Sequence, residues 1–267
     1  MFRLIARRPI LAHLLSPPEL PLYSITQISK RCSLSYSSTQ KMTDFTLYGA
    51  RGSSNADRVR LVIAESGLTN CKEVQLDFAK RDHKSPENML RHPWGKVPAV
   101  VFEDGFTLYE SRPICQYIAR KYKLPLLPTD ADPKAMALFE QASSVEANYF
   151  NPPASKISFE KLAKARFLGL PADEAVVEAA VKELDTFFSI IEGLLQDKQY
   201  MAGDNFSLVD IYYIPLVQRL FLFGYSDMIT GRQNVAAWWE RCVGRPAIKA
   251  VMAADAAAAP GAPKKDA

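Results

Sequence analysis

The pattern of apolar residues changes near residue 123, and this change constrains the fold more than any other feature of the chain. Before it, short runs typical of strands alternate with amphipathic helical segments. After it, every apolar segment repeats at the 3.6-residue spacing of a helix. We therefore expect a small sheet covered by helices, followed by an all-helical region.

The first region has the order β-α-β, a loop, then β-β-α. Strands are expected at 45–49 and 71–78, a hairpin at 94–111, and helices at 56–68 and 111–122. The dipeptide Asp104-Gly105 predicts the tight turn of the hairpin. Gly67 should end the first helix, and Pro113 suits the first turn of the second.

The second region begins after a segment with three prolines, 123–135, which resembles a linker. Helices are expected at 133–150, 173–197, 207–224 and 234–245. Ser207 and Asp210 have the spacing of a capping box at the start of an apolar, buried helix, with Phe206 placed as a hydrophobic staple. Their predicted role is structural. The chain ends in a low-complexity segment, 253–267, expected to be disordered.

Residues 1–41 differ in composition from the rest. They contain six basic residues and one acidic residue and are rich in serine, the profile of an organellar transit peptide. A mitochondrial address fits better than a plastid one. The alternative is a disordered extension with no targeting role. A second start at Met42 would give a cytoplasmic form.

Charge and cysteine usage exclude several functions. Of the net charge of +4, residues 42–267 contribute −1, so a nucleic-acid partner has no electrostatic support. No apolar run approaches the ~20 residues that span a bilayer. The four cysteines have no CxxC spacing and do not cluster with the three histidines, so we expect neither a metal site nor a disulfide framework.

The dipeptide Val97-Pro98 stands at the head of a strand that should pair inside the sheet. Proline cannot donate to the sheet's hydrogen bonds. Either the bond is cis and turns the Val97 backbone toward an extended peptide ligand, or Pro98 lies on a simple edge strand. The residues alone favour neither of these two interpretations.

Charged residues flank this strand. Glu110 and Ser111 lie at a strand-to-helix junction, where Ser111 should be the N-cap, and together they suit the two charges of an amino-acid head group. His83, Lys84 and Lys96 are three donors that could hold a carboxylate. Taken singly, each is also an ordinary surface residue.

The layout resembles a glutathione transferase of the phi class of plants and fungi. The similarity is carried in order by "DHKSPENMLRHPWGKVPA", "YESRPICQYIARKY", "VEANYFNPPASKISFEKL", "GLPADEAVVEAAVKELD", "YMAGDNFSLVDIYYIP" and "WWERCVGRPAIKAV". It implies an α+β/α fold: a thioredoxin-like N-terminal domain at 42–123, a linker at 124–134 and an all-α C-terminal domain at 135–252.

The resemblance also implies one ligand for the charged residues. His83, Lys84 and Lys96 match the positions that receive the glycine carboxylate of glutathione, although the family often has Gln at Lys96. Val97 matches the residue whose backbone pairs with the cysteine of the tripeptide, and Pro98 matches a cis-proline. Glu110 and Ser111 match the pair that binds the γ-glutamyl group. Glutathione is then a co-substrate, and no metal is implied.

The electrophile side is less specific. By resemblance, Ser54, Phe78, Phe159 and Ala163 face an apolar acceptor site, and Phe159 and Ala163 share one helix face. The alternative for each is ordinary packing. Trp94 matches an aromatic residue of the family's dimer contact, which implies a homodimer.

Two adjacent serines precede the first helix. Phi-class enzymes use a serine here to donate a hydrogen bond to the glutathione sulfur, and the alignment assigns this catalytic role to Ser53, with Ser54 as the alternative. Ser54 has Asp57 three residues later, so we expect Ser54 to cap the helix. The family commonly has Thr and Arg at Ala56 and Asp57, and Asp57 places a negative charge near the thiolate.

The implied activity is conjugation of glutathione to apolar electrophiles, with reduction of organic hydroperoxides as a side activity and roles in detoxification and oxidative stress. A thiol transferase or dehydroascorbate reductase is a weaker reading, since those relatives have Cys where this chain has Ser53 and the nearest cysteine is Cys71. A third reading is a non-catalytic carrier or interaction module of the same fold.

Overall fold

A computed structural model describes residues 43–129 and 131–257. The first half contains four strands: β1 (Phe45–Gly49), β2 (Cys71–Gln75), β3 (Ala99–Phe102) and β4 (Thr107–Tyr109). Its helices are α1 (Ser54–Ser66), η1 (Asp82–Lys84), α2 (Pro86–Arg91) and α3 (Ser111–Lys121). The expected order of elements is confirmed, except that η1 and α2 form within the segment expected to be a loop. The second strand ends at Gln75, three residues earlier than expected.

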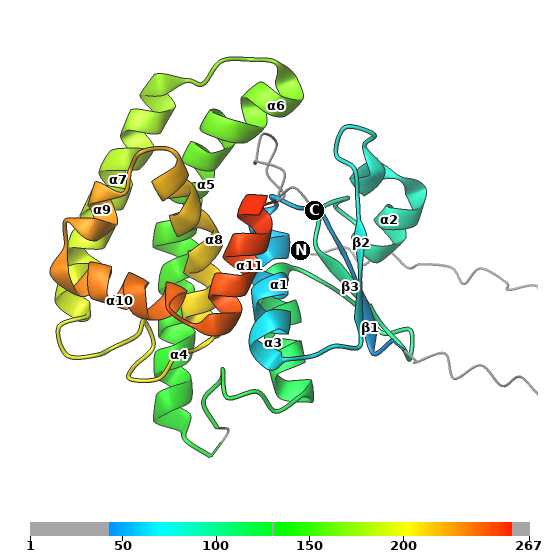
Figure 1. Cartoon of the computed structure of the whole chain (residues 1–267), viewed down its shortest axis with the longest axis horizontal. Helices are drawn as coiled ribbons and strands as arrows, with labels where there is room; N and C mark the ends of the chain where they lie inside the picture. The colour runs from blue at the N-terminus through cyan, green and yellow to red at the C-terminus, as the bar shows by residue number, and fades with distance from the viewer. Residues whose placement is uncertain (1–42, 130, 258–267) are drawn as a thin grey trace, which may run out of the picture. The chain divides into compact units, whose positions relative to one another are not determined.

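The four strands form one mixed sheet in the order β2-β1-β3-β4. β2 runs parallel to β1, whereas β3 is antiparallel to both β1 and β4. α1 and α3 pack together on one face of the sheet, and α2 lies on the other (Figure 1). Residues of β1 alternate between buried and half-buried, so Phe45 and Leu47 enter the core beneath the helices.

Beyond residue 123 the described chain forms helices, as expected. They are α4 (Pro133–Val145), η2 (Glu146–Phe150), α5 (Asn151–Ser158), η3 (Phe159–Ala163), α6 (Lys164–Leu168), α7 (Glu174–Leu194), α8 (Leu208–Leu222), α9 (Asp227–Thr230), α10 (Gln233–Val243) and α11 (Pro246–Ala257). η2 and η3 are single π-helical turns that join α4, α5 and α6 into one interrupted helix.

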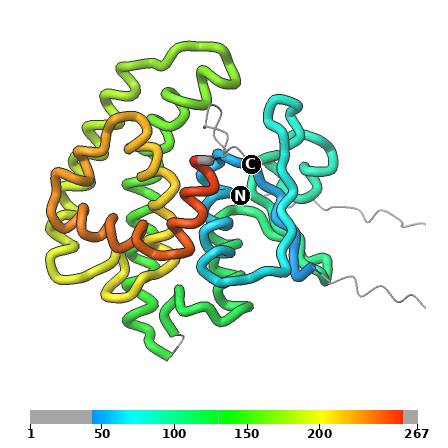
Figure 2. The backbone as a smooth tube through the Cα atoms, viewed as in Figure 1, coloured from blue at the N-terminus to red at the C-terminus, as the bar shows by residue number. Residues whose placement is uncertain are grey.

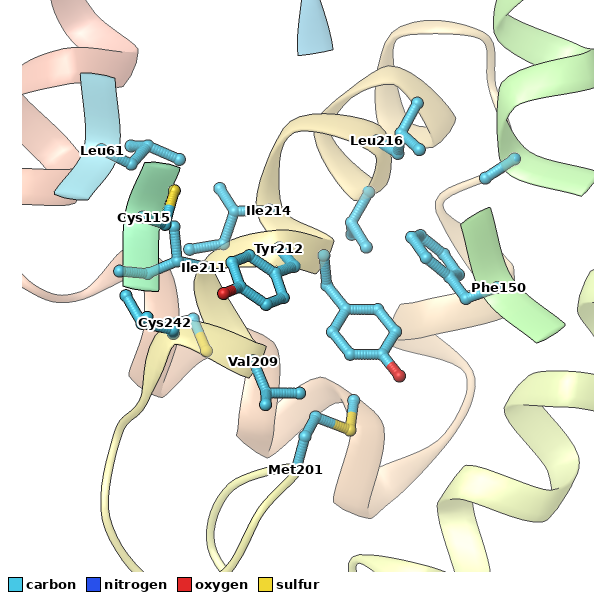
Figure 3. Packing of buried hydrophobic residues seen from close by; sticks show 14 of the residues in the cluster. Leu61, Cys115, Phe150, Met201, Val209, Ile211, Tyr212, Ile214, Leu216 and Cys242 are labelled. Atoms are coloured by element: carbon cyan, nitrogen blue, oxygen red, sulfur yellow. The ribbon is translucent and has the colours of Figure 1, made fainter. Parts of the chain in front are cut away.

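α8 is the central helix of this half and is buried on nearly all sides. Figure 3 shows its side chains between Cys115 of α3 and Phe150 of η2. The capping box is present: Ser207 Oγ accepts from Val209 N at 3.2 Å, and the Asp210 carboxylate accepts from Ser207 N at 2.9 Å. Asp210 also accepts from Met201 N and from Trp238 Nε1, both at 2.9 Å. Asp210 therefore joins α8 to α10 as well as capping α8.

α11 corrects the expectation for the C-terminal tail. The helix continues to Ala257, five residues into the segment expected to be disordered. It packs along α1, so the last described helix returns to the first (Figure 2). Arg60 of α1 bonds Asp255 of α11 at 2.8 Å, which explains the added order. The extension at 1–41 and residues 258–267 lie outside the described residues.

Within the described ranges, no helix is both long and apolar enough to cross a membrane.

Candidate active site

The turn between β1 and α1 places Ser53, not Ser54, at the helix N-terminus. Gly52 has a φ of 77°, a conformation that glycine adopts without steric cost, and Ser53 is extended. The helical hydrogen bonds begin with Asp57 N to Ser53 O at 2.8 Å. Ser53 Oγ accepts from Ala56 N at 3.4 Å, so Ser53 is the N-cap and Ser54 is the first helical residue. The expectation that Ser54 caps α1 is wrong, because the helix begins one residue earlier.

The cap leaves the Ser53 hydroxyl a donor. A hydroxyl has one hydrogen and two lone pairs. Ser53 Oγ uses a lone pair for Ala56 N, and within the described residues no acceptor takes its hydrogen. Ser53 is half-buried at a helix N-terminus, where peptide dipoles favour an anion. One residue can therefore both cap α1 and donate to a bound thiolate.

The Val97-Pro98 peptide bond is cis, as the first of the two sequence interpretations required, and the pairing of Val97 with a peptide ligand stays a prediction. Strand pairing of β3 begins at Ala99, the residue after Pro98. The buried Val97 therefore lies outside the hydrogen-bonded strand pairing. Asn88 Nδ2 ties the preceding loop by donating to Lys96 O at 3.3 Å and to His83 O at 2.9 Å. The backbone of Val97 is thus held beside the sheet by neighbouring loops.

Helix α3, which follows β4, also begins one residue earlier than expected. Glu110 is the N-cap residue with a φ of 72°, and Ser111 is the first helical residue and is buried. The expectation that Ser111 is the N-cap is wrong. The Glu110 side chain is 61% exposed, with Oε1 at 3.9 Å from Nε2 of His92. Burial, opposed by Glu110, lowers the pKa of His92, so this imidazole is a weak partner and Glu110 remains open to an ammonium group.

The three predicted donors, His83, Lys84 and Lys96, lie around one loop. Lys84 Nζ donates to Trp94 O at 2.8 Å, and the backbone of Gly95 approaches both Lys84 and the carbonyl of His83. Burial, and then the neighbouring Lys84, lowers the pKa of His83. The His83 ring is also packed edge-on against Phe78, at 4.8 Å between centroids. His83 is therefore a neutral donor, and Lys84 and the exposed Lys96 supply the charge.

The apolar side includes a residue that the sequence reasoning missed. Phe78 packs edge-on against Phe167 of α6 at 5.6 Å, and both line a cavity of about 260 Å³ beside Ala50 and Arg51. Phe159 is 47% exposed, and Ala163 ends the same π-helical turn. Phe159, Ala163 and Phe167 recur every four residues, so a helix-face pattern would have revealed Phe167.

A buried cluster of charged side chains, Arg58, Arg112 and Glu146, lies next to the start of α3. Arg58 of α1 and Glu146 of η2 have no exposed side-chain surface and form an ion pair at 3.2 Å. Arg112, next to Ser111, donates from Nε to the other oxygen of Glu146 at 2.7 Å. Arg58 also donates to Tyr212 O and to Asn151 Oδ1, at 2.9 and 2.8 Å. Two guanidiniums against one carboxylate leave net positive charge beneath the site, which favours bound anions. An Arg on the apolar face of α1 was the overlooked signal.

Family comparisons identify this arrangement. The N-terminal domain model of glutathione S-transferases matches residues 43–120, and the C-terminal domain model matches residues 123–246. A rice protein described as probable glutathione S-transferase GSTF2 is 35% identical over 210 residues, covering 79% of this chain and 96% of the relative. Maize glutathione S-transferase 1 is 34% identical, with coverages of 79% and 97%.

Solved structures agree with these matches. Glutathione transferase F7 from Populus trichocarpa superposes with a TM-score of 0.74 at 32% identity, covering 78% of this chain and 98% of its own. A maize glutathione S-transferase I in complex with an atrazine glutathione conjugate gives 0.73 at 34% identity, with coverages of 79% and 97%. The chain therefore belongs to the glutathione S-transferase family. Its relatives place it in the phi class, as expected. The roles of individual site residues remain predictions.

Proposed function

We propose that this protein transfers glutathione, through its thiol sulfur, to apolar electrophiles. Ser53 is the catalytic residue that donates a hydrogen bond to the thiolate. One observation carries the proposal: Ser53 caps α1 with its oxygen, and no acceptor among residues 43–129 and 131–257 takes its hydrogen, which can therefore go to a ligand at the helix N-terminus. A sulfur there would receive a hydrogen bond together with the field of the helix end.

Three groups around this point suit the three parts of glutathione. The exposed carboxylate of Glu110 suits the γ-glutamyl ammonium, and the helix start at Ser111 suits its carboxylate. The backbone of Val97, which lies outside the strand pairing of β3, suits the cysteine residue of the tripeptide. The loop of His83, Lys84 and Lys96 suits the glycine carboxylate.

The chemistry is nucleophilic attack by sulfur. The glutathione thiol releases its proton to solvent, and Ser53 stabilises the resulting thiolate. The thiolate sulfur then forms a bond to an electrophilic carbon, and the leaving group departs with its electron pair. Lowering a thiol pKa of about 8.5 by ~2 units needs ~2.7 kcal/mol of differential stabilisation. The thiolate fraction at pH 7 rises about 25-fold, but lower nucleophilicity cancels about eightfold of that gain if the behaviour of disulfide exchange applies. Most of the rate must then come from holding the two reactants together.

The acceptor side offers aromatic side chains to an apolar electrophile, in a cavity whose lining also includes the charged residues Arg51, Asp77 and Arg166. The aromatic pair Phe78 and Phe167 lines the cavity beside the end of β1, and Phe159 is exposed on the same interrupted helix. The maize relative whose structure contains an atrazine glutathione conjugate supports this class of acceptor.

The direct test is turnover by the full chain. Glutathione should react with 1-chloro-2,4-dinitrobenzene, and cumene hydroperoxide in a parallel assay tests the proposed peroxidase side activity. Calorimetry should detect glutathione binding without the electrophile. Binding without turnover of either acceptor would favour a non-catalytic carrier, and neither binding nor turnover would refute the proposal.

We further propose that the enzyme is a homodimer in which each copy inserts Trp94 into the other. Trp94 is 60% exposed and is supported by His92 and Tyr109. An apolar groove of about 560 Å³ lies between α7 and the η2–α5 segment, with Tyr149 and Ile190 at its exposed edges. An aromatic side chain and a groove on one chain are complementary in a two-fold pair. Light scattering should give a dimer for the protein and a shift to monomer for Trp94→Ser; a monomeric native protein would contradict the proposal.

For residues 1–41 we propose a mitochondrial transit peptide, supported by their basic, serine-rich composition. A fluorescent reporter fused to residues 1–45 should enter mitochondria. Replacing Arg3, Arg7 and Arg8 by Gln should leave it in the cytoplasm. A reporter that stays cytoplasmic with the native segment would contradict the proposal.

A further inference from the structure

Arg219 of α8 reaches the turn that holds Ser53. Its Nη2 donates to the carbonyl oxygen of Gly52, directly before Ser53, and its Nη1 donates to Ser158 Oγ of α5. Ser158 in turn directly precedes Phe159 of the proposed acceptor site. One guanidinium therefore connects the turn of the thiol site to the helix of the acceptor site.

The charge of Arg219 is not neutralised by a direct ion pair. Within residues 43–129 and 131–257 both of its hydrogen bonds go to neutral oxygens. Burial lowers its pKa, opposed by the nearby Asp57. Burying a guanidinium opposite neutral partners has a desolvation cost, which a neutral donor such as Gln would avoid. The positive charge of Arg219 therefore has a role besides the two hydrogen bonds that connect the Gly52 turn to α5.

Asp57 is the opposing charge on the first turn of α1. Its carboxylate contacts Arg60 at 3.1 Å, but Arg60 also binds Asp255 of α11 at 2.8 Å and lies 3.6 Å from Glu73 of β2. Three carboxylates thus share one arginine, which leaves an excess of negative charge behind the helix N-terminus. Farther along the site, the cavity beside Ala50 is lined by the charged residues Arg51, Asp77 and Arg166.

We infer that Arg219 is a positioning residue of the thiol site: its two hydrogen bonds hold the Gly52–Ser53 turn against α5, and its positive charge offsets the carboxylates behind α1 so that the thiolate of glutathione is favoured. The inference depends on the proposed role of Ser53. It adds a residue from the helical half of the chain to a thiol site otherwise built on the sheet half.

The test measures the pH dependence of kcat/KM for glutathione in full-length Arg219→Gln, Arg219→Lys and Asp57→Asn. A nearby charge typically shifts a pKa by about 1 unit or more. Arg219→Gln should move the profile upward by about 1 pH unit, whereas Arg219→Lys, which keeps the positive charge, should stay close to the native profile. Asp57→Asn should move it downward, because one of the opposing carboxylates is removed. KM for glutathione should change less than kcat, since Arg219 contacts no proposed glutathione-binding group.

The outcomes separate this inference from the proposed function. A native enzyme without turnover refutes the proposed function. An active native enzyme whose Arg219→Gln profile is unshifted while its melting temperature falls refutes only the inference, because Arg219 is then a structural latch. If Arg219→Gln does not fold, the Lys and Asn variants decide: an unshifted Asp57→Asn profile, or an upward shift of a full unit in Arg219→Lys, would overturn it.

Discussion

Glu146 of η2 and Arg58 of α1 form an ion pair across the interface between the helical half and the sheet half, and neither side chain is exposed to solvent. Breaking a buried pair by removing one partner costs about 3–5 kcal/mol, because the other charge stays buried without compensation. Glu146→Gln leaves both Arg58 and Arg112 without their carboxylate. We expect its free energy of unfolding to fall by about that amount.

Urea unfolding checks this prediction. The matched control is Glu178→Gln, which breaks an exposed pair with Lys182 on α7 and should leave the midpoint unchanged. Equal midpoints for Glu146→Gln and the native protein would show that the buried cluster contributes no net stability.

Asp210 should contribute more to the free energy of unfolding than a helix cap alone does. Its carboxylate accepts four hydrogen bonds, from Met201 N, Ser207 N, Ser207 Oγ and Trp238 Nε1. A lost cap costs about 1 kcal/mol, and each further buried donor left unpaired adds about 1–3 kcal/mol. Asp210→Ala should therefore destabilise the protein by at least about 3 kcal/mol. Ser207→Ala, which leaves the carboxylate in place, should cost about 1 kcal/mol.

Thermal and urea unfolding of the two variants give the comparison. Folded Asp210→Ala should have the pH–rate profile of the native enzyme. Asp210 lies at the N-terminal, capped end of α8, away from the Ser53 turn. Similar losses in both variants would mean that the bonds to Met201 and Trp238 contribute little.

Ser53 and Ser54 should respond differently to loss of the hydroxyl. Ser53→Ala removes both the proposed thiolate donor and the cap of α1, so the pH at which turnover appears should rise by up to ~2 units and stability should fall by about 0.5–2 kcal/mol. Ser53→Thr keeps both functions and should restore most of the stability. Ser54→Ala, at the first helical position, should leave the pH–rate profile unchanged. An inactive Ser54→Ala beside an unaltered Ser53→Ala profile would exchange the two assignments.

The sequence predicted the features whose causes are local. Gly67 ends α1 in the left-handed conformation, and the Ser207–Asp210 box starts α8, because each depends on residues a few positions apart. The N-cap of α1 at Ser53 was missed by one residue, since two adjacent serines offer the same cap and only the turn at Gly52 distinguishes them. The contacts of Glu146 with Arg58 and of Arg219 with Gly52 join residues 88 and 167 positions apart, so no local pattern could have revealed them.

Asp57 should make stability depend on pH. Burial raises the pKa of its carboxyl from 3.8 to about 6, against the opposing effect of Arg60. Between these values the folded state binds more protons than the unfolded state, so this contribution to stability is present at low pH and is lost as pH rises through about 6. Asp57→Asn does not titrate, and above that pH it should be more stable than the native protein. Two pKa units correspond to about 2.7 kcal/mol, and loss of a favourable charge in the first helical turn offsets about 0.5 kcal/mol.

Urea unfolding at pH 4 and pH 7.5 measures this effect. The difference between Asp57→Asn and the native protein should be small at the lower pH and about 2 kcal/mol at the higher. Asp227→Asn is the matched control for removing a carboxylate from a first helical turn, because Asp227 has this position in α9 but is exposed. A gap for Asp57→Asn that is the same at both pH values would mean that the carboxylate is paired well enough to ionise normally. In that case, Arg60 rather than burial would determine its charge.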